Sequence, residues 1–288
     1  RSIALFSTLT VISLVAYRVE VRPEGFSYAF LALYFFLFSK FKESSISLKV
    51  LLPLLIVSQI LWVNIHIFFF LGILMCGIFL LDALINKSDQ VKSLGILLGS
   101  LITSSLVNPH FVHGLLSPLT ILNEYGYMVA ENQTVFFMHD RFGNPELIHF
   151  EVFAVIAAAI ISFFVIRNSW KQYFISILAV LVFGILSATA VRGIPLFALF
   201  FIPLLTGFIQ RYVDNLNFKT RQSFMRILPV VGLIFCVLFL GLKGTYASAR
   251  NGYEGLGLIP NINRCGEFLR KEQIPGRMFN KKQKTKNK

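Results

Sequence analysis

Four short polar segments interrupt the apolar sequence, and their side chains could bind or transfer charged groups. The first is Arg22-Pro23-Glu24. Proline suits the first turn of a helix because its missing N–H would be unpaired there anyway, so one interpretation is a helix start with an interfacial arginine. The other is functional: the Arg22 guanidinium offers a rigid fork to a phosphate at the membrane surface, and Glu24 orients it or moves protons.

The second segment, Asn64-Ile65-His66, breaks an apolar stretch that runs from residue 50 to residue 85. A bilayer is crossed by roughly 20 residues, so the chain must turn near this point. Backbone groups in such a turn need protein or water around them. Either this is a tight turn with Trp62 at the interface, or Asn64 and His66 line an aqueous cavity, where polar groups inside a membrane are usually functional.

The third and fourth segments are Asn108-Pro109-His110 and the segment that begins at Arg192. Pro109 ends the preceding helix, and His110 and His113 share a face of any helix that begins there. Such a pair could ligate a divalent metal, but no H-E-x-x-H motif and no nearby cysteine accompany it, which favours an ordinary interfacial pair. Arg192 lies between two apolar runs and faces either a cavity or the lipid head groups, because an unpaired charge inside a membrane is costly.

The elements that must position these residues are membrane helices. Hydrophobic residues make up 56% of the 288 and charged residues 14%, with a mean hydropathy of +0.70, whereas soluble domains average about 25% charged residues. Apolar runs occur at residues 3–17, 26–39, 50–63, 67–85, 93–107, 150–166, 173–189, 196–209 and 227–242. We therefore expect an all-α, polytopic transmembrane helical bundle with about nine spans. Runs 26–39 and 196–209 are short, so broken or partly inserted helices are the alternative there.

The charges set the expected orientation. The net charge is +13, but the basic residues lie mainly in short loops and in the tail, which indicates a lipid bilayer and no nucleic acid as partner. Loops 40–49, 86–92, 167–172 and 210–226 contain eleven Lys and Arg, and the alternate loops 18–25, 64–66, 108–149 and 190–195 contain four. The positive-inside rule places the first set in the cytoplasm and the polar segments outside. Residues 1–242 would form the transmembrane domain and residues 243–288 a short extracytoplasmic tail, the start of a C-terminal domain.

The order and spacing of the four segments resemble those of a bacterial membrane glycosyltransferase group of the GT-C type, the family-39-like and RgtA/B/C/D-like proteins. The resemblance rests on Arg22-Pro23, on the sequence Leu-Trp-Val-Asn-Ile-His that ends at His66, on Asn108-Pro109, and on Arg-Gly-Ile-Pro-Leu-Phe-Ala-Leu from Arg192. Glu131-Asn132-Gln133 is similar to a Glu-Trp-Gln element in the long loop of that group, with Asn132 where Trp is usual. Residues 268–280 are similar to the start of its extracytoplasmic C-terminal domain.

The resemblance implies a transferase that takes a sugar from a polyprenyl-phosphate donor at the outer face of the bacterial inner membrane and passes it to a glycan, lipid or protein acceptor. Arg22 or Arg192 would hold the carrier phosphate. Four residues would line the sugar or acceptor site: Asn64, His66, Asn108 and His110. The acidic motif that supplies the base in that group would lie before the first residue of this sequence. Glu24 and Glu131 are therefore the residues expected to serve in acid–base catalysis here.

Two other functions fit the same residues. A transporter or flippase would use them to line its cavity, and a non-catalytic membrane scaffold would tolerate their replacement. No Walker loop, dinucleotide fingerprint or G-x-S-x-G elbow is present, so soluble-enzyme motifs do not decide between these functions. We expect no certain cofactor, with a divalent metal as the possible exception.

Overall fold

A computed structural model describes residues 1–15, 23–124, 132–142 and 145–251, so Arg22, Glu131 and the tail beyond residue 251 lie outside the described residues. Contacts divide the chain into two units, Arg1–Phe239 and Leu240–Lys288, and the helices that end at or before Val213 belong to the first. The predicted domain boundary after residue 242 stays a prediction.

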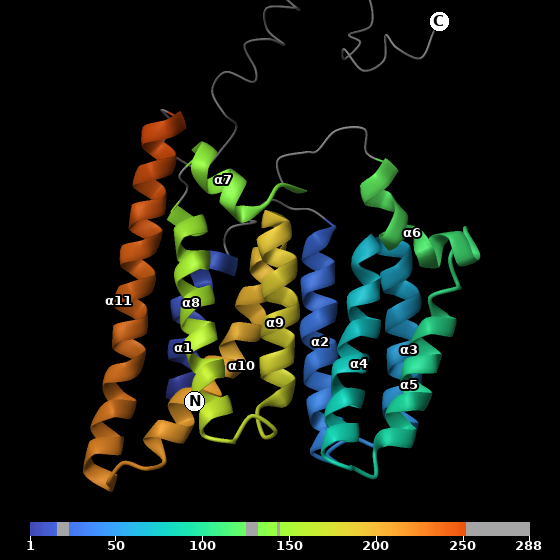
Figure 1. The fold of residues 1–288 in the computed structure, drawn as a ribbon, viewed down its shortest axis with the longest axis horizontal. Helices are drawn as coiled ribbons and strands as arrows, with labels where there is room; N and C mark the ends of the chain where they lie inside the picture. The colour runs from blue at the N-terminus through green and yellow to red at the C-terminus, as the bar shows by residue number, and fades with distance from the viewer. Residues whose placement is uncertain (16–22, 125–131, 143–144, 252–288) are drawn as a thin grey trace, which may run out of the picture. The chain divides into compact units, whose positions relative to one another are not determined.

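The described residues are all-α, with eleven α-helices (Figure 1). They are α1 Ser2–Val15, α2 Glu24–Lys42, α3 Leu48–Ile65, α4 Phe70–Ile85, α5 Val91–Ser104, α6 Phe111–Glu124, α7 Val135–Phe142, α8 Pro145–Ile166, α9 Phe174–Thr189, α10 Ile194–Val213 and α11 Phe218–Asn251. Two 3₁₀ turns, η1 Ile67–Phe69 and η3 Val191–Gly193, directly precede α4 and α10. Each of the nine predicted apolar runs overlaps an α-helix in the described residues, and the run at 196–209 lies in a continuous α10.

Five stretches in the described part of the chain are long and apolar enough to cross a membrane: Leu48–Ile65, Ile67–Ile85, Leu147–Ile166, Val191–Val213 and Phe218–Phe239. Ser2–Val15, Val91–Ser104 and Phe174–Thr189 are apolar but shorter. The 14 residues of α1 extend about 21 Å at 1.5 Å per residue, less than the ~30 Å of a bilayer core. The chain is thus a helical protein with five candidate membrane spans, and the count of nine stays a prediction.

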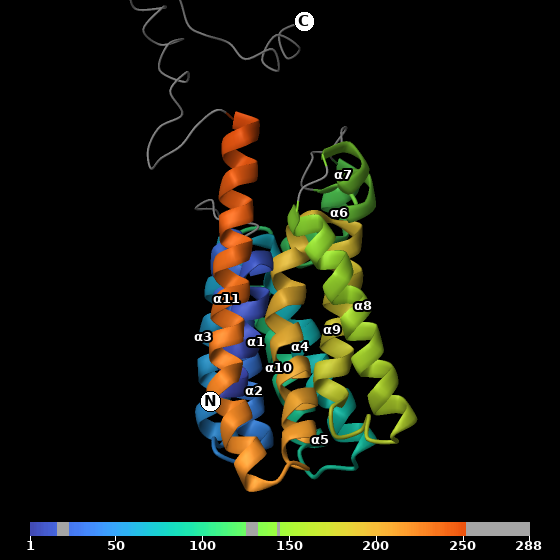
Figure 2. The same cartoon turned by 90° about the vertical axis from the view of Figure 1, so that its left-hand side faces the viewer.

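The helices pack side by side in a continuous series (Figures 1 and 2). Helix α10 lies between α1 and α9, α9 contacts α4, and α4 contacts α2 and α5, which in turn contact α3. Close approach of α2, α3 and α4 depends on Gly72, where a Cβ would lie 2.7 Å from Cε2 of Tyr34 and 2.9 Å from Cζ3 of Trp62. Small residues at such crossings let membrane helices approach closely.

A buried polar cluster joins α2, α3 and α5 inside the bundle. The Tyr34 hydroxyl lies 3.0 Å from Oε1 of Gln59 and 3.1 Å from Oγ of Ser58. The Gln59 amide donates to Oγ of Ser105 at 2.9 Å and to the backbone oxygen of Phe69 at 3.2 Å. Because a bilayer offers no water to such groups, they must satisfy one another, and the cluster therefore fixes the register of these helices.

The two ends of the bundle differ in their connections (Figure 1). The basic end carries connections 43–47, 86–90, 167–173 and 214–217, and the histidine end carries η1, η3, α6 and α7. At the basic end, a residue with left-handed backbone lies two positions beyond the end of helices α2, α4 and α8: Ser44 (φ 58°), Lys87 (φ 51°) and Asn168 (φ 51°). In each turn the following N–H bonds back to a carbonyl five residues earlier, the pattern of a Schellman cap. The sequence-based assignment of ends to compartments stays a prediction.

Candidate functional site

Two chain breaks with the same local structure form the centre of the histidine end. His66 directly follows helix α3 and Ala190 directly follows helix α9, and both have extended backbone, with φ, ψ of −153°, 144° and −147°, 115°. A 3₁₀ turn follows each residue, and α4 or α10 then begins. The two breaks meet through side chains of η1 and η3, which brings residues far apart in sequence into one site.

Local sequence explains both breaks. The His66 ring accepts a hydrogen bond from the backbone N–H of Phe68 at 3.4 Å, which caps the turn in the way that short polar side chains cap helices. In the second break, a Cβ on Gly193 would lie 3.0 Å from Cα of Ser187. The Ser187 hydroxyl oxygen lies 2.6 Å from the backbone oxygens of both Phe183 and Gly193, so the turn is locked onto the end of α9.

A chain of hydrogen bonds fixes the proton position on His66. The Trp62 indole N–H donates to Oγ of Ser27 at 2.8 Å, and Oγ of Ser27 lies 2.8 Å from Nδ1 of His66. The backbone N–H of Phe68 donates to Nδ1 of His66 at 3.4 Å, so Nδ1 is an acceptor, and the Ser27 hydroxyl donates to it while the Ser27 oxygen accepts from the indole. With Nδ1 unprotonated, His66 is neutral and carries its proton on Nε2. Burial first, and then the charge of Arg192, lower the pKa of His66, while the charge of Glu24 opposes them.

Arg192 and Glu24 flank this histidine. The Arg192 guanidinium lies 5.1 Å from the centre of the Phe68 ring, and that ring packs edge-on against His66 with centroids 4.6 Å apart. The Tyr28 hydroxyl donates to the backbone oxygen of Arg192 at 3.1 Å. Glu24 is buried at the start of α2. Among the described residues no carboxylate forms an ion pair with Arg192, so a half-buried cation faces the site without a protein counter-ion there.

A hollow of about 310 Å³ adjoins this group, and four predicted site residues line it: Asn64, His66, Asn108 and His110. Both asparagines are bound to backbone. The Asn64 amide donates to the carbonyls of Ile60 and Val107 at 2.8 Å. The Asn108 amide donates to the carbonyls of Ser105 and Phe111, and its oxygen accepts from the His110 N–H. They hold the walls of the hollow, which leaves His66 and His110 as its ionisable groups.

The described residues do not form a metal centre. His110 and His113 are neighbours at the start of α6, but within the described ranges no group of three or more His, Cys, Asp or Glu side chains could hold a metal ion. The two remaining histidines are bound elsewhere. Nδ1 of His139 lies 2.8 Å from Oε1 of Glu151, and the His149 ring packs at 3.7 Å on that of Phe239.

The structure thus brings five of the predicted residues around His66: Glu24, Asn64, Asn108, His110 and Arg192. Sequence reasoning missed Ser27, Tyr28 and Phe68, which connect them. A signal for two of these existed, since Glu24, Ser27 and Tyr28 follow the i, i+3, i+4 spacing of a single helix face. No sequence signal distinguished Phe68, because it is one of 31 phenylalanines.

Comparison with protein-family models, curated proteins and solved structures gives no match for this chain. The glycosyltransferase resemblance thus remains a prediction, and the chain is a helical protein with five candidate membrane spans.

Proposed function

We propose that this protein is a membrane glycosyltransferase that takes a sugar from a polyprenyl-phosphate carrier at the histidine end. One observation carries the proposal: a half-buried arginine, without a carboxylate partner among the described residues, lies beside a neutral histidine and a buried glutamate. A cation can stabilise the charge of a leaving phosphate, and a carboxylate or a histidine can transfer protons.

Arg192 would bind the carrier phosphate. A guanidinium presents a planar fork that matches phosphate oxygens, and here its orientation is set by Phe68 and by the bond from Tyr28 to its backbone. Helices α4 and α10 both begin beside η1 and η3, so the positive ends of two helix dipoles add to the same field. The isoprenoid chain would lie along the apolar helices in the lipid.

His66 and Glu24 would act on the reacting groups. The Nε2–H of His66 would donate to an oxygen of the sugar or of the phosphate. The Glu24 carboxylate would accept the proton of the acceptor hydroxyl as that oxygen attacks the anomeric carbon. The bond between the anomeric carbon and the phosphate oxygen then breaks, and polyprenyl phosphate leaves with the bonding electrons while Arg192 stabilises its charge.

The test is sugar transfer from a radiolabelled polyprenyl-phosphate sugar by the full-length protein in liposomes. We expect Arg192→Gln to reduce turnover by about 100-fold, as loss of a charge-stabilising donor does, and Glu24→Gln by about 100-fold or more. Arg226→Gln, the same charge change at an exposed position of α11, should retain wild-type turnover. Equal activity of all variants would remove this site assignment.

A transporter is the second candidate function, and one observation favours it. Hollows exist at both ends of helices α2 to α5, with the polar cluster of Tyr34, Ser58, Gln59 and Ser105 between them. The route is closed by the fully buried side chains of Trp62, Tyr34 and Phe38, so transport would need these to move. Movement of the intact lipid-linked sugar across liposomes, without cleavage of its bond to phosphate, would identify this function instead.

A further inference from the structure

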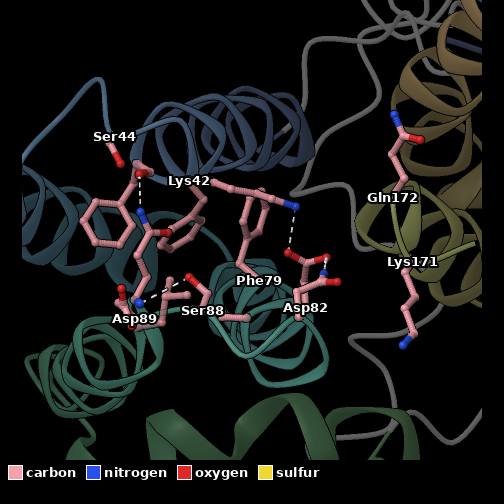
Figure 3. A pocket seen from close by; sticks show the side chains of 14 residues that line it. Lys42, Ser44, Phe79, Asp82, Ser88, Asp89, Lys171 and Gln172 are labelled. Atoms are coloured by element: carbon pink, nitrogen blue, oxygen red, sulfur yellow. Dashed lines mark hydrogen bonds and ion pairs between the residues drawn. The ribbon is translucent and has the colours of Figure 1, made fainter.

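A hollow larger than the one beside His66 lies at the basic end. Its volume is about 610 Å³, and residues of α2, α4, α5 and the α8–α9 connection line it (Figure 3). Three phenylalanines, Phe38, Phe41 and Phe79, contribute an apolar part. A second hollow of about 380 Å³ shares Lys42, Phe79 and Gln172 with it. The basic end therefore has room for a ligand with both a polar and an apolar part.

An ion pair holds one wall of this hollow. Nζ of Lys42 donates to Oδ2 of Asp82 at 2.7 Å, and the Asn86 amide donates to Oδ1 of the same carboxylate at 3.0 Å. The Asp82 side chain is 4% exposed, whereas that of Lys42 is 44% exposed. An ammonium has three donors, so Lys42 is anchored through one of them and keeps the other two for a ligand.

The opposite wall supplies a second cation. Lys171 and Gln172 belong to the α8–α9 connection and lie across the hollow from Lys42 and Asp82 (Figure 3). The Lys171 ammonium lies 5.7 Å from the centre of the Trp170 ring, a pairing typical of the membrane interface. Loops 40–49, 86–92 and 167–172 together contain seven Lys and Arg against Glu43 and Asp89. This excess complements a negative ligand.

We propose that this hollow binds the phosphate head group of an anionic phospholipid between Lys42 and Lys171. A lipid is the occupant that fits, because the hollow combines cationic walls with phenylalanines and opens at an end of membrane helices where basic residues gather. Basic pockets between membrane helices are known to take anionic head groups. The inference does not depend on sugar transfer at the histidine end.

The experiment is native mass spectrometry of the whole protein released from nanodiscs that contain phosphatidylglycerol and phosphatidylcholine in equal amounts. We expect phosphatidylglycerol to remain bound, and Lys171→Gln to weaken this binding about fivefold, the effect of one lysine at a membrane surface. The double variant Lys42→Gln with Asp82→Asn removes the second cation without leaving a buried carboxylate unpaired, and should weaken it by a similar factor. Lys49→Gln is the matched control, because Lys49 is exposed at the same end and does not line the hollow.

Three results would overturn the proposal. Equal weakening by Lys171→Gln and Lys49→Gln would mean that diffuse surface charge, not the hollow, holds the lipid. Equal retention of phosphatidylglycerol and phosphatidylcholine would exclude recognition of the anionic head group. Full displacement of the lipid by millimolar inorganic phosphate would identify free phosphate as the ligand. Thermal unfolding of each variant, followed by circular dichroism, confirms that the protein measured is folded.

Discussion

Helix α4 connects two sites that handle charge in different ways. At its start, η1 contributes Phe68, which lies between the Arg192 guanidinium and a neutral His66, and the surrounding bonds run through uncharged groups. At its last turn, Asp82 pairs with Lys42 and with Asn86. One end therefore presents a cation with no described counter-ion, and the other presents a cation whose counter-ion is part of the protein.

This difference predicts different kinds of binding. A half-buried arginine with no described carboxylate partner is stabilised when an anion binds, so one anionic group can be held firmly and in one orientation. A lysine already paired with a buried aspartate gains less from an anion, and the surrounding surface charges add weak, salt-sensitive attraction. Substitutions should accordingly affect the two ends through different interactions, and the four predictions below test this.

The largest effect is expected at the basic end. Lys42→Met would leave the buried Asp82 carboxylate with Asn86 as its remaining partner. Breaking a buried pair costs 3–5 kcal/mol, and since the Lys42 side chain is 44% exposed we expect a smaller loss of about 2 kcal/mol in the free energy of unfolding. Thermal unfolding in detergent micelles measures it. Adding Asp82→Asn should restore most of the stability, and a double variant as unstable as the single one would contradict the ion-pair explanation.

At the histidine end the corresponding substitution is Ser27→Ala. It removes the acceptor of the buried Trp62 N–H and the donor to Nδ1 of His66. Leaving such groups unsatisfied costs about 1–2 kcal/mol. The control is Ser39→Ala on the same helix, where no side-chain hydrogen bond is found among the described residues. Similar unfolding temperatures for both variants would show that the chain from Trp62 to His66 contributes little.

Sequence reasoning predicted the elements of both ends better than their chemistry. The length and composition of the apolar runs predicted a helix at each of them, because burial in lipid leaves few alternatives to a helix. The segments with Arg192 and His66 were recognisable as breaks, since polar residues inside apolar runs are costly. The meeting of these breaks was not predictable, because it depends on how α3, α4, α9 and α10 pack.

The hollow at the basic end was not predicted, for a related reason. Each of its loops contains lysine and turn-forming residues, which by themselves give no sign of a binding site. Asp82 alone gave a signal, as an acidic residue within an apolar run. Its partner Lys42 is 40 positions away, and no local pattern connects two such residues. The hollow between them therefore became visible only in three dimensions.

A smaller effect on stability should depend on pH and arise from His66 at the histidine end. Burial and the charge of Arg192 lower the pKa of His66 below its ordinary value of 6.5, and the charge of Glu24 opposes this shift. Between the lowered pKa and pH 6.5, the unfolded chain therefore binds more protons than the folded one. The contribution to stability is complete above pH 6.5 and is lost as the pH falls through this window. We expect the unfolding temperature to fall between pH 7.5 and pH 5.5, by less than Ser27→Ala causes.

The His66→Gln variant isolates this contribution. Glutamine can still accept from Ser27 but does not titrate, so the fall in unfolding temperature should be smaller in the variant than in the wild type. All other residues are the same in the two proteins, so their contributions to the pH dependence cancel in the comparison. Parallel pH profiles for the two proteins would mean that His66 does not carry the dependence.

The smallest effects concern the backbone of the connections. Ser44 has a left-handed backbone with φ 58°, and this conformation costs a residue with a Cβ about 1–2 kcal/mol. Glycine avoids that cost but loses more chain entropy on folding. We therefore expect Ser44→Gly to stabilise the protein by about 0.5 kcal/mol. Asn168→Gly should change little, because asparagine tolerates this conformation. At the histidine end the equivalent position, Ala190, is extended with φ −147°, and Ala190→Gly should destabilise by about 0.5–1 kcal/mol. Opposite signs for Ser44→Gly and Ala190→Gly in thermal unfolding would establish that the turns at these two residues reverse the chain by different backbone geometries, and equal signs would refute it.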